Sequence, residues 1–390
     1  MQVCHAPGQG WEPTEAREFV LDVGVAALAN DAFDCALSEL IIDKSLDLVI
    51  CRLPRKFALK VHEFFNSEVE RPRRMTVPSV ANPDLEVLFD NKARWNLPDF
   101  RRHGFHNLHT TMRYAMSLRA PRILPLRKEI DWTVGERPEV ARYLAMPHFS
   151  AFIAVRDDRI LYEAYAPDFG PDRPHPIMSI TKTTINLMLG RCVSDGLIDL
   201  DRPVKDYLPE IGTGYAEATV KATADMNVAN DYTEDYTDAN STVFDLEAAL
   251  GWRLPREGQK EETTHSFLCG ITGSDLTNRS GEVLYKSANS EVLRWIIERA
   301  SGRPLRDWLI EIVEAAGIEG CFHIACDREG VPGSAFLTAR DLARYGLLFA
   351  RKGEGIGGRR VGDAASSNTR AVIQALPGRS RAIAQDIAAR

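Results

Sequence analysis

The chain has 390 residues, of which 44% are hydrophobic and 26% are charged, and its formal net charge at pH 7 is -7. This composition is typical of a globular protein with a substantial core, arranged as one large domain or two lobes. The negative charge argues against nucleic acid or an acidic membrane surface as a partner. No stretch approaches the roughly 20 consecutive apolar residues that a membrane-spanning helix needs.

The seven cysteines form no C-x-x-C pair, and their odd number and scattered spacing indicate reduced thiols. The amino terminus shows no secretory signal, because its first Lys or Arg is Arg17 and the apolar run that follows is interrupted by Asp22. The sequence therefore predicts a cytoplasmic protein that binds neither membranes nor nucleic acid.

The first part of the chain, residues 1–90, is the least regular. Residues 34–46 and 56–65 have helical apolar rhythms, whereas residues 46–53 predict a strand. Proline and polar residues gather near residues 70–85 and indicate a linker. The sequence thus predicts an amino-terminal segment of uncertain structure over residues 1–90 and a main domain over residues 91–390.

The main domain begins with a clear β-hairpin. Two apolar runs, each about seven residues long, are joined by a polar turn at Arg156–Asp158. A loop with four prolines follows over residues 166–176. Beyond it, to about Leu348, the pattern is mostly helical with few convincing strands. One helix is expected to end near Gly196, two more to be separated at Ser301–Gly302, and another to begin at Thr338.

Ser179 and Lys182 stand three residues apart at the start of the first of these helices. A serine hydroxyl needs a base within hydrogen-bond reach to act as a nucleophile, and residues three apart share a helix face. In a first helical turn, free backbone N–H groups and the helix dipole would also stabilise an oxyanion. The alternative is that Ser179 caps the helix while Lys182 is solvated.

A second polar motif, with Tyr285, Ser287 and Asn289, precedes another amphipathic helix. A tyrosine beside a lysine ammonium can accept a proton from serine and return it to a leaving group. The alternative is a buried aromatic anchor, with Ser287 or Asn289 capping the helix. Between the two motifs lies an acidic, aromatic loop over residues 231–238, which would suit an ammonium or amide ligand or be a solvated surface loop.

Ser-x-x-Lys after a hairpin, followed by a tyrosine motif that leads a helix, resembles the serine β-lactamase and penicillin-binding-protein superfamily. Within its class C, esterase-like branch, the pattern is most similar to the nylon-oligomer (6-aminohexanoate-dimer) hydrolases. The resemblance covers roughly residues 92–350. It rests on five segments in the same order: IMSITK at 177–182, DYTEDYTD at 231–238, AALGWR at 248–253, YKSANSEVLRWIIERASG at 285–302 and TARDLARYG at 338–346.

The resemblance implies an α+β fold of the β-lactamase/transpeptidase type, with an antiparallel sheet flanked by helices and an all-helical lobe. It makes Ser179 the acylated nucleophile, Lys182 its activator and Tyr285 the proton shuttle. Three further residues are expected beside the substrate. Tyr236 would hydrogen-bond the substrate's amide, Glu247 would lie near the substrate's amino end, and Asn289 would also bind the substrate.

The sequence departs from this superfamily after residue 350. The third motif, Lys-Thr-Gly or His-x-Gly on a strand beside the nucleophile, does not occur. That strand lends a backbone N–H to the oxyanion hole, and losing one such donor typically costs a factor of about 10² to 10³ in rate. The tail is short and rich in Ala, Arg, Ser and Gly. We therefore expect the carboxyl-terminal strands to be missing, through truncation or a shifted reading frame, and the hairpin edge to be exposed.

His103, His106 and His109 would line one face of a helix, but no fourth ligand is evident and no metal or other cofactor is expected. The leading hypothesis is a serine hydrolase that cleaves a small amide or ester through an acyl-enzyme. One alternative is an inactive remnant of this fold. Another is a β-lactamase or D-Ala-D-Ala carboxypeptidase, against which the missing export signal counts.

Overall fold

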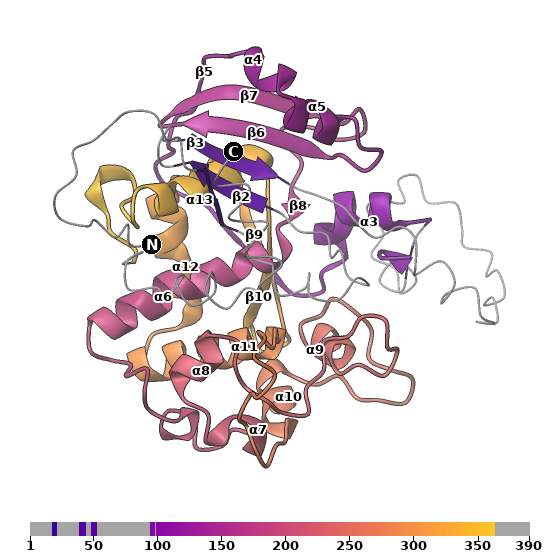
Figure 1. The fold of residues 1–390 in the computed structure, drawn as a ribbon, viewed down its shortest axis with the longest axis vertical. Helices are drawn as coiled ribbons and strands as arrows, with labels where there is room; N and C mark the ends of the chain where they lie inside the picture. Colours follow the sequence, from indigo (N-terminus) through magenta and orange to yellow (C-terminus); the bar gives the residue numbers. More distant parts are fainter. Residues whose placement is uncertain (1–17, 22–38, 44–47, 53–93, 98, 363–390) are drawn as a thin grey trace.

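The computed structural model describes residues 18–21, 39–43, 48–52, 94–97 and 99–362 (Figure 1). For the three short amino-terminal ranges it describes the backbone alone. The helix expected over residues 56–65, the linker near 70–85 and the tail after residue 362 lie outside the described residues. The division of the chain at residue 90 stays a prediction.

The larger sheet has six strands in the order β1-β2-β3-β6-β7-β5. Its centre is the expected hairpin, formed by β6 (Ala151–Arg156) and β7 (Arg159–Tyr165), which turns at Asp157, where φ is 56°. The strand β5 (Arg127–Lys128) adds to β7 in parallel, and all other pairs are antiparallel. Residues Ala151 to Val155 of β6 are all buried, so both faces of this strand are covered.

The hairpin edge that we expected to be exposed is paired with strands from the amino-terminal part of the chain. The strand β3 (Leu48–Arg52) runs antiparallel to β6, from Leu48 opposite Arg156 to Arg52 opposite Phe152. Beyond it lie β2 (Glu39–Asp43) and β1 (Glu18–Leu21). The prediction of an exposed edge is therefore wrong, and so is the helical interpretation of residues 39–43. A short run such as ELIID fits either period, and pairing with neighbouring strands decides between them.

A second, four-stranded sheet lies between the hairpin and the helical lobe, in the order β4-β9-β10-β8. Its strands are β4 (Ala115–Leu118), β8 (His175–Pro176), β9 (Phe322–Cys326) and β10 (Pro332–Leu337). Strands β9 and β10 are a correction, because the pattern before Leu348 indicated helices and loops. Both are short apolar runs that pair with each other across a short connection, and their outer partners, β4 and β8, are remote in sequence.

The helical lobe occupies the lower part of Figure 1. The helices that follow the hairpin are α6 (Thr183–Ser194), α7 (Thr213–Ala216), α8 (Val220–Ala224), α9 (Val243–Ala249), α10 (Thr264–Gly270), α11 (Ser287–Ser301), α12 (Leu305–Ala316) and α13 (Ala339–Ala350). The expected ends are confirmed: Gly196 and Gly302 are left-handed, with φ of 72° and 61°. The expected start is confirmed as well, because Thr338 Oγ1 accepts a hydrogen bond from the Asp341 backbone N–H.

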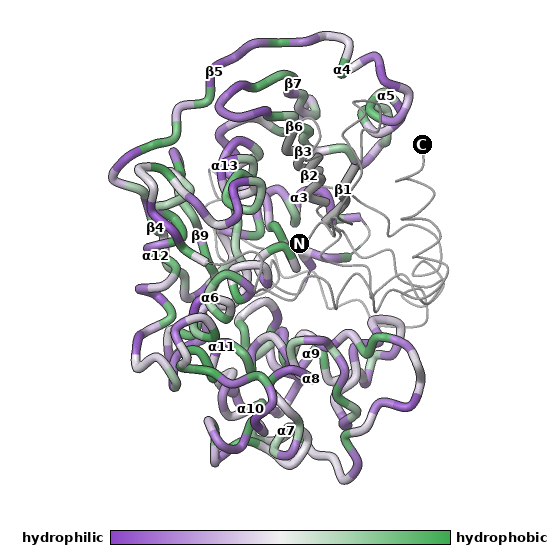
Figure 2. Tube along the Cα trace, turned by 60° about the vertical axis from the view of Figure 1, so that its left-hand side comes forward, coloured by the Kyte–Doolittle hydropathy of each residue, from purple (hydrophilic) through white to green (hydrophobic). Residues whose placement is uncertain are grey.

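Helix α13 packs against β2, β3 and β6, while α4 (Thr133–Glu136) and α5 (Pro138–Leu144) lie near β7 (Figure 1). Hydrophilic and hydrophobic residues alternate along α13 in Figure 2, as expected for a helix with one side against a sheet. Within the described residues, no helix is both long and apolar enough to cross a bilayer.

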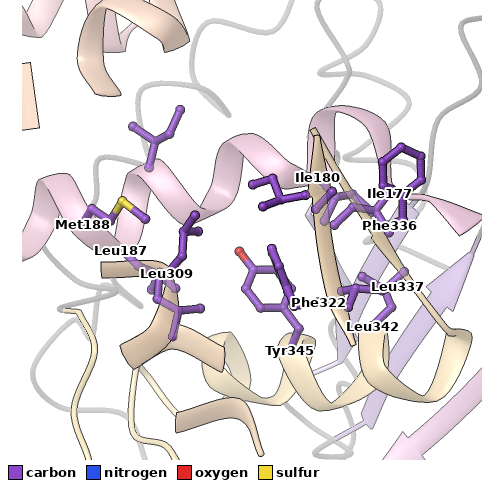
Figure 3. Close-up of a cluster of buried hydrophobic side chains, with 14 of the residues drawn as sticks. Ile177, Ile180, Leu187, Met188, Leu309, Phe322, Phe336, Leu337, Leu342 and Tyr345 are labelled. Carbon is purple, nitrogen blue, oxygen red and sulfur yellow. The ribbon is translucent and has the colours of Figure 1, made fainter. Parts of the chain in front are cut away.

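The core that supports the start of α6 is shown in Figure 3. Tyr345 of α13 is fully buried beside Phe322, and its hydroxyl points toward α6. That hydroxyl lies 2.6 Å from Thr183 Oγ1, on the first residue of α6. The amino end of this helix is thus fixed to the same core that carries the second sheet.

Candidate active site

Ser179 lies in a short 3₁₀ turn, Met178–Lys182, that runs directly into α6. Two hydrogen bonds fix this turn to β10: Ile177 N–H donates to the Ala335 carbonyl at 2.9 Å, and Ala335 N–H donates to Thr181 Oγ1 at 3.0 Å. Met178, immediately before the serine, has a φ of 45°, a left-handed conformation that is rare outside glycine. The serine is therefore presented from a sharp, firmly held turn at the head of a helix.

Lys182 and Tyr285 both reach the Ser179 hydroxyl. Lys182 Nζ donates to Ser179 Oγ at 3.0 Å, and Tyr285 Oη lies 2.8 Å from the same oxygen. The lysine ammonium also lies 5.3 Å from the centroid of the Tyr285 ring. All three side chains are partly exposed. The structure thus brings together the alcohol, the amine and the phenol that the sequence singled out.

Charges around Lys182 favour its ammonium form. Burial opposes the charge, but Tyr285 and Glu234 outweigh that effect, so the pKa of Lys182 is raised above its ordinary value. Burial also raises the pKa of Glu234, while Lys182 acts in the opposite direction. The amine is therefore suited to hold a proton and to stabilise negative charge on its neighbours.

The segment that carries Tyr285 is fixed to the loop at residues 230–234. Lys286 Nζ donates to the side chain of Asn230 at 2.7 Å, to the Asn230 carbonyl at 3.2 Å and to the Tyr232 carbonyl. Burial lowers the pKa of Lys286 to about 8. On its other side, Ser287 donates its N–H and its hydroxyl to the Glu234 carboxylate, at 2.5 and 2.8 Å.

Two aspartates of the acidic loop at residues 231–238 accept hydrogen bonds from neighbouring threonines. Asp231 accepts hydrogen bonds from the backbone and hydroxyl of Thr272, and Asp235 accepts them from those of Thr237. A polar cavity of about 580 Å³ lies beside this loop. Its lining residues are Thr213, Ala229, Asn230, Asp231, Thr272, Gly273, Ser274 and Asp275, with no aromatic side chain among them.

Tyr236 and Glu247 belong to one chain of contacts. The Tyr236 ring packs edge-on against Phe244 at 5.8 Å, and the Arg253 guanidinium lies 4.4 Å from the Phe244 ring centroid. Arg253 in turn forms an ion pair with Glu247. Burial raises the pKa of Glu247, and Arg253 opposes the shift. The carboxylate expected near a substrate's amino end therefore already has a cationic partner within the chain.

Asn289 does not lie where the sequence placed it. Its side chain is fully buried, its Oδ1 accepts from the Tyr215 hydroxyl at 2.7 Å, and its Nδ2 donates to the Thr223 carbonyl at 3.1 Å. Both ends of the amide bind inside the lobe, so this fully buried side chain joins α11 to α7 and α8 and does not face a substrate. Sequence reasoning missed that this side of α11 faces the lobe interior.

The three histidines near residue 106 do not form a metal site. Helix α3 (Arg101–Asn107) ends before His109, so the three side chains do not share one helix face. Across the described part of the chain, no group of three or more His, Cys, Asp or Glu residues could hold a metal ion. His106 Nε2 instead lies 3.0 Å from Ser150 Oγ, with Asp168 Oδ2 3.6 Å from its Nδ1. Ser150 is only 5% exposed, so this arrangement is buried rather than open to a substrate.

The chain combines a sheet flanked by helices with a serine, a lysine and a tyrosine that meet at the head of one helix. This combination is typical of the β-lactamase/transpeptidase-like fold. A sequence model described as β-lactamase matches residues 148–382, more than half of the chain. The chain belongs to the β-lactamase family.

Two proteins with related descriptions are similar to this chain. The 6-aminohexanoate-dimer hydrolase of Paenarthrobacter ureafaciens is 33% identical over 244 residues, which cover 60% of this chain and 59% of the relative. The chain thus spans about three fifths of the length of this curated relative. A solved structure from Bacillus anthracis, described as a "putative 6-aminohexanoate-dimer hydrolase", has a TM-score of 0.60 at 20% identity and covers 76% of this chain and 78% of its own. This similarity supports the expected β-lactamase/transpeptidase-like fold.

Proposed function

We propose that the chain is a serine hydrolase that cleaves a small amide or ester through an acyl-enzyme. The observation that carries this proposal is the meeting of Lys182 Nζ and Tyr285 Oη on the Ser179 hydroxyl, at 3.0 and 2.8 Å. Such a contact between a nucleophile and its proton acceptor is what covalent catalysis by serine requires.

In the proposed reaction, Tyr285 acts as a phenolate stabilised by the Lys182 ammonium, and its Oη accepts the Ser179 proton as Ser179 Oγ attacks the substrate carbonyl carbon. Lys182, as an ammonium, stabilises the negative charge that develops around the two oxygens. When the tetrahedral intermediate collapses, the bond to the leaving amine or alcohol breaks and the leaving group takes the proton back through Tyr285. Water then repeats the sequence on the ester of Ser179 and releases the acid.

The named relatives favour a short, linear amide as the substrate class, since each is described as a 6-aminohexanoate-dimer hydrolase. Tyr236 would hydrogen-bond the amide group of such a substrate. Glu247 is kept as a candidate at the far end of the site, with Arg253 as its partner. The four described cysteines are unpaired, in agreement with the reducing cytoplasm that we propose as the location.

The test is covalent labelling with a fluorophosphonate probe. Wild-type protein should be labelled at a single serine, and Ser179→Ala should abolish the label. Ser194→Ala, at the other end of α6, is the matched control and should label normally. Equal labelling of the Ser179→Ala variant and the wild type would refute the proposal.

Two alternative functions are separated by substrate assays. An inactive remnant would show neither a burst nor a steady rate with p-nitrophenyl acetate. A β-lactamase or cell-wall peptidase would be acylated rapidly by a labelled penicillin, whereas the proposed hydrolase should turn over the ester and react slowly with the penicillin.

A further inference from the structure

Glu234 is a partly buried carboxylate between two segments of the candidate site. Its two oxygens accept the N–H of Ser287 at 2.5 Å and the hydroxyl of Ser287 at 2.8 Å. The same carboxylate accepts the hydroxyl of Tyr232 at 3.1 Å and that of Tyr236 at 3.5 Å. Four donors from two remote parts of the chain thus meet on one side chain.

The two segments joined at Glu234 both carry residues of the proposed mechanism. Ser287 is the first residue of α11 and lies two positions after Tyr285. The position of its backbone therefore limits where the Tyr285 side chain can lie. Tyr236 lies two positions after Glu234 in the neighbouring loop. An N–H in the first turn of a helix has no acceptor inside the helix, and the Glu234 carboxylate is the acceptor for the Ser287 N–H. A shift of the carboxylate would therefore move the Tyr285 segment relative to Ser179.

Glu234 also brings a negative charge within electrostatic range of the nucleophile. Three groups around Lys182 raise its pKa against the effect of burial, namely Tyr285, Glu234 and Glu291. Glu291 is already neutralised by Arg294, with which it forms a buried ion pair on α11. Glu234 forms no such ion pair, since its described hydrogen bonds come from hydroxyl and backbone donors. The charged groups that interact with it are the Lys182 and Lys286 ammonium groups.

We propose that Glu234 is a positioning residue of this site, whose carboxylate joins the Tyr236 loop to the Tyr285 segment and sets a negative charge beside Lys182. It acts through Tyr285 and Lys182 and does not touch the reacting atoms. The kinetic consequences of this inference rest on the proposed acyl transfer. The hydrogen bonds by which Glu234 joins the two segments can be tested without any activity.

Three variants test the two roles of the carboxylate. Glu234→Gln keeps the shape and an acceptor oxygen but removes the charge, Glu234→Asp keeps the charge but withdraws it by one methylene, and Glu234→Ala removes both. Asp327→Asn is the matched control, because Asp327 is a buried carboxylate that also accepts backbone N–H groups, at Thr264 and Val331, away from the site.

With a p-nitrophenyl ester, Glu234→Gln should lower kcat about tenfold or more while KM changes less than threefold, because misplaced catalytic groups affect the chemical step. Loss of the charge should also move the basic limb of the kcat–pH profile, where Lys182 loses its proton, to lower pH by about one unit. Glu234→Asp keeps the negative charge, so its basic limb should lie at the same pH as in the wild type. Asp327→Asn should leave both kcat and the profile of the folded enzyme unchanged. Wild-type kcat and an unshifted limb in Glu234→Gln would overturn the proposal.

Hydrogen exchange of the Ser287 amide gives a measurement that does not depend on activity. It should be slow in the wild type and in Asp327→Asn, and at least tenfold faster in Glu234→Ala. An unchanged rate in Glu234→Ala would refute the structural role even if the protein proved inactive. Conversely, loss of protection in a protein whose Ser179 is never labelled would support Glu234 as a positioning residue and refute the hydrolase.

Discussion

The phenolic oxygen of Tyr285 lies 2.8 Å from the hydroxyl oxygen of Ser179, although the two residues are 106 positions apart. Lys182 approaches the same hydroxyl from its own helical turn at 3.0 Å. The raised pKa of Lys182 favours its ammonium form. In the proposed reaction the two partners of the nucleophile therefore have different tasks: Tyr285, as a phenolate, accepts the serine proton, and Lys182 stabilises the negative charge.

Tyr285→Phe should therefore lower kcat by about 10² to 10⁴, the usual contribution of a positioned proton-transfer group. KM for a p-nitrophenyl ester should change little, since the ring and its packing remain. Steady-state kinetics and the rate of fluorophosphonate labelling measure the effect. Tyr114→Phe, at an exposed tyrosine, is the control. A Tyr285→Phe variant that labels at the wild-type rate would show that Lys182 is the base instead.

Asn289→Ala should reduce stability rather than substrate binding. The substitution leaves the Tyr215 hydroxyl without its Asn289 acceptor and the Thr223 carbonyl with the Met226 N–H alone, and an unsatisfied buried polar group costs about 1–3 kcal/mol. Urea unfolding should show a loss of about 2 kcal/mol or more, with KM of the remaining folded enzyme unchanged. A large rise in KM with unaltered stability would instead return Asn289 to the substrate site.

The parts of this molecule that the sequence predicted are those governed by local rules. The hairpin from Ala151 to Tyr165 consists of two apolar runs joined by a polar turn, and Gly196, Gly302 and Thr338 act within one helical turn of their own positions. The proximity of Lys182 to Ser179 follows from their spacing in the same way. The polar motif marked Tyr285 as a possible proton shuttle, but only the resemblance to a family assigned it to Ser179, because no local rule brings it to a serine so far away.

The parts that the sequence did not predict depend on tertiary packing. Strands β2, β9 and β10 are short apolar runs whose period fits more than one structure, and only pairing in the sheets decides it. β2 pairs with β3, and β9 with β10, across short connections, while β9 also pairs with β4 and β10 with β8, which are remote in the chain. Asn289 and Glu234 illustrate the same point for side chains. Which side of α11 faces the lobe, and which loop lies against its first turn, are tertiary properties that the motif alone does not contain.

Ile50→Pro tests whether the amino-terminal strands complete the larger sheet. β3 lies between β2 and β6, with Ile50 opposite Ile41 on one side and Ala154 on the other. A proline there removes a ladder N–H from the middle of a sheet, and we expect a loss of about 3 kcal/mol in the free energy of unfolding. Ile50→Val, which keeps the N–H, should unfold within about 1 kcal/mol of the wild type. Equal midpoints for the two variants in urea would contradict the pairing of β3 with β6.

His106 should make the protein sensitive to acid. The pKa of this imidazole is lowered from 6.5 to about 3. Burial is the largest cause, His175, Arg102 and Arg173 act in the same direction, and Asp168 acts in the opposite direction. Between these two pH values the unfolded chain binds a proton that the folded chain does not, so the folded state loses stability as the pH falls from about 6.5 toward 3. By pH 5 the loss from this residue should be about 2 kcal/mol.

The measurement is the free energy of unfolding in urea at several pH values between 4.5 and 7.5. His106→Gln should flatten the dependence by about that amount, because an amide can face Ser150 without titrating. His103→Gln, on the exposed side of the same helix, should leave the slope unchanged. His109, whose pKa burial lowers to about 4, contributes a similar slope that both variants retain. If the His106→Gln protein loses stability toward acid as steeply as the wild type, His106 is protonated in the folded state and the buried contact with Ser150 must open as the pH falls.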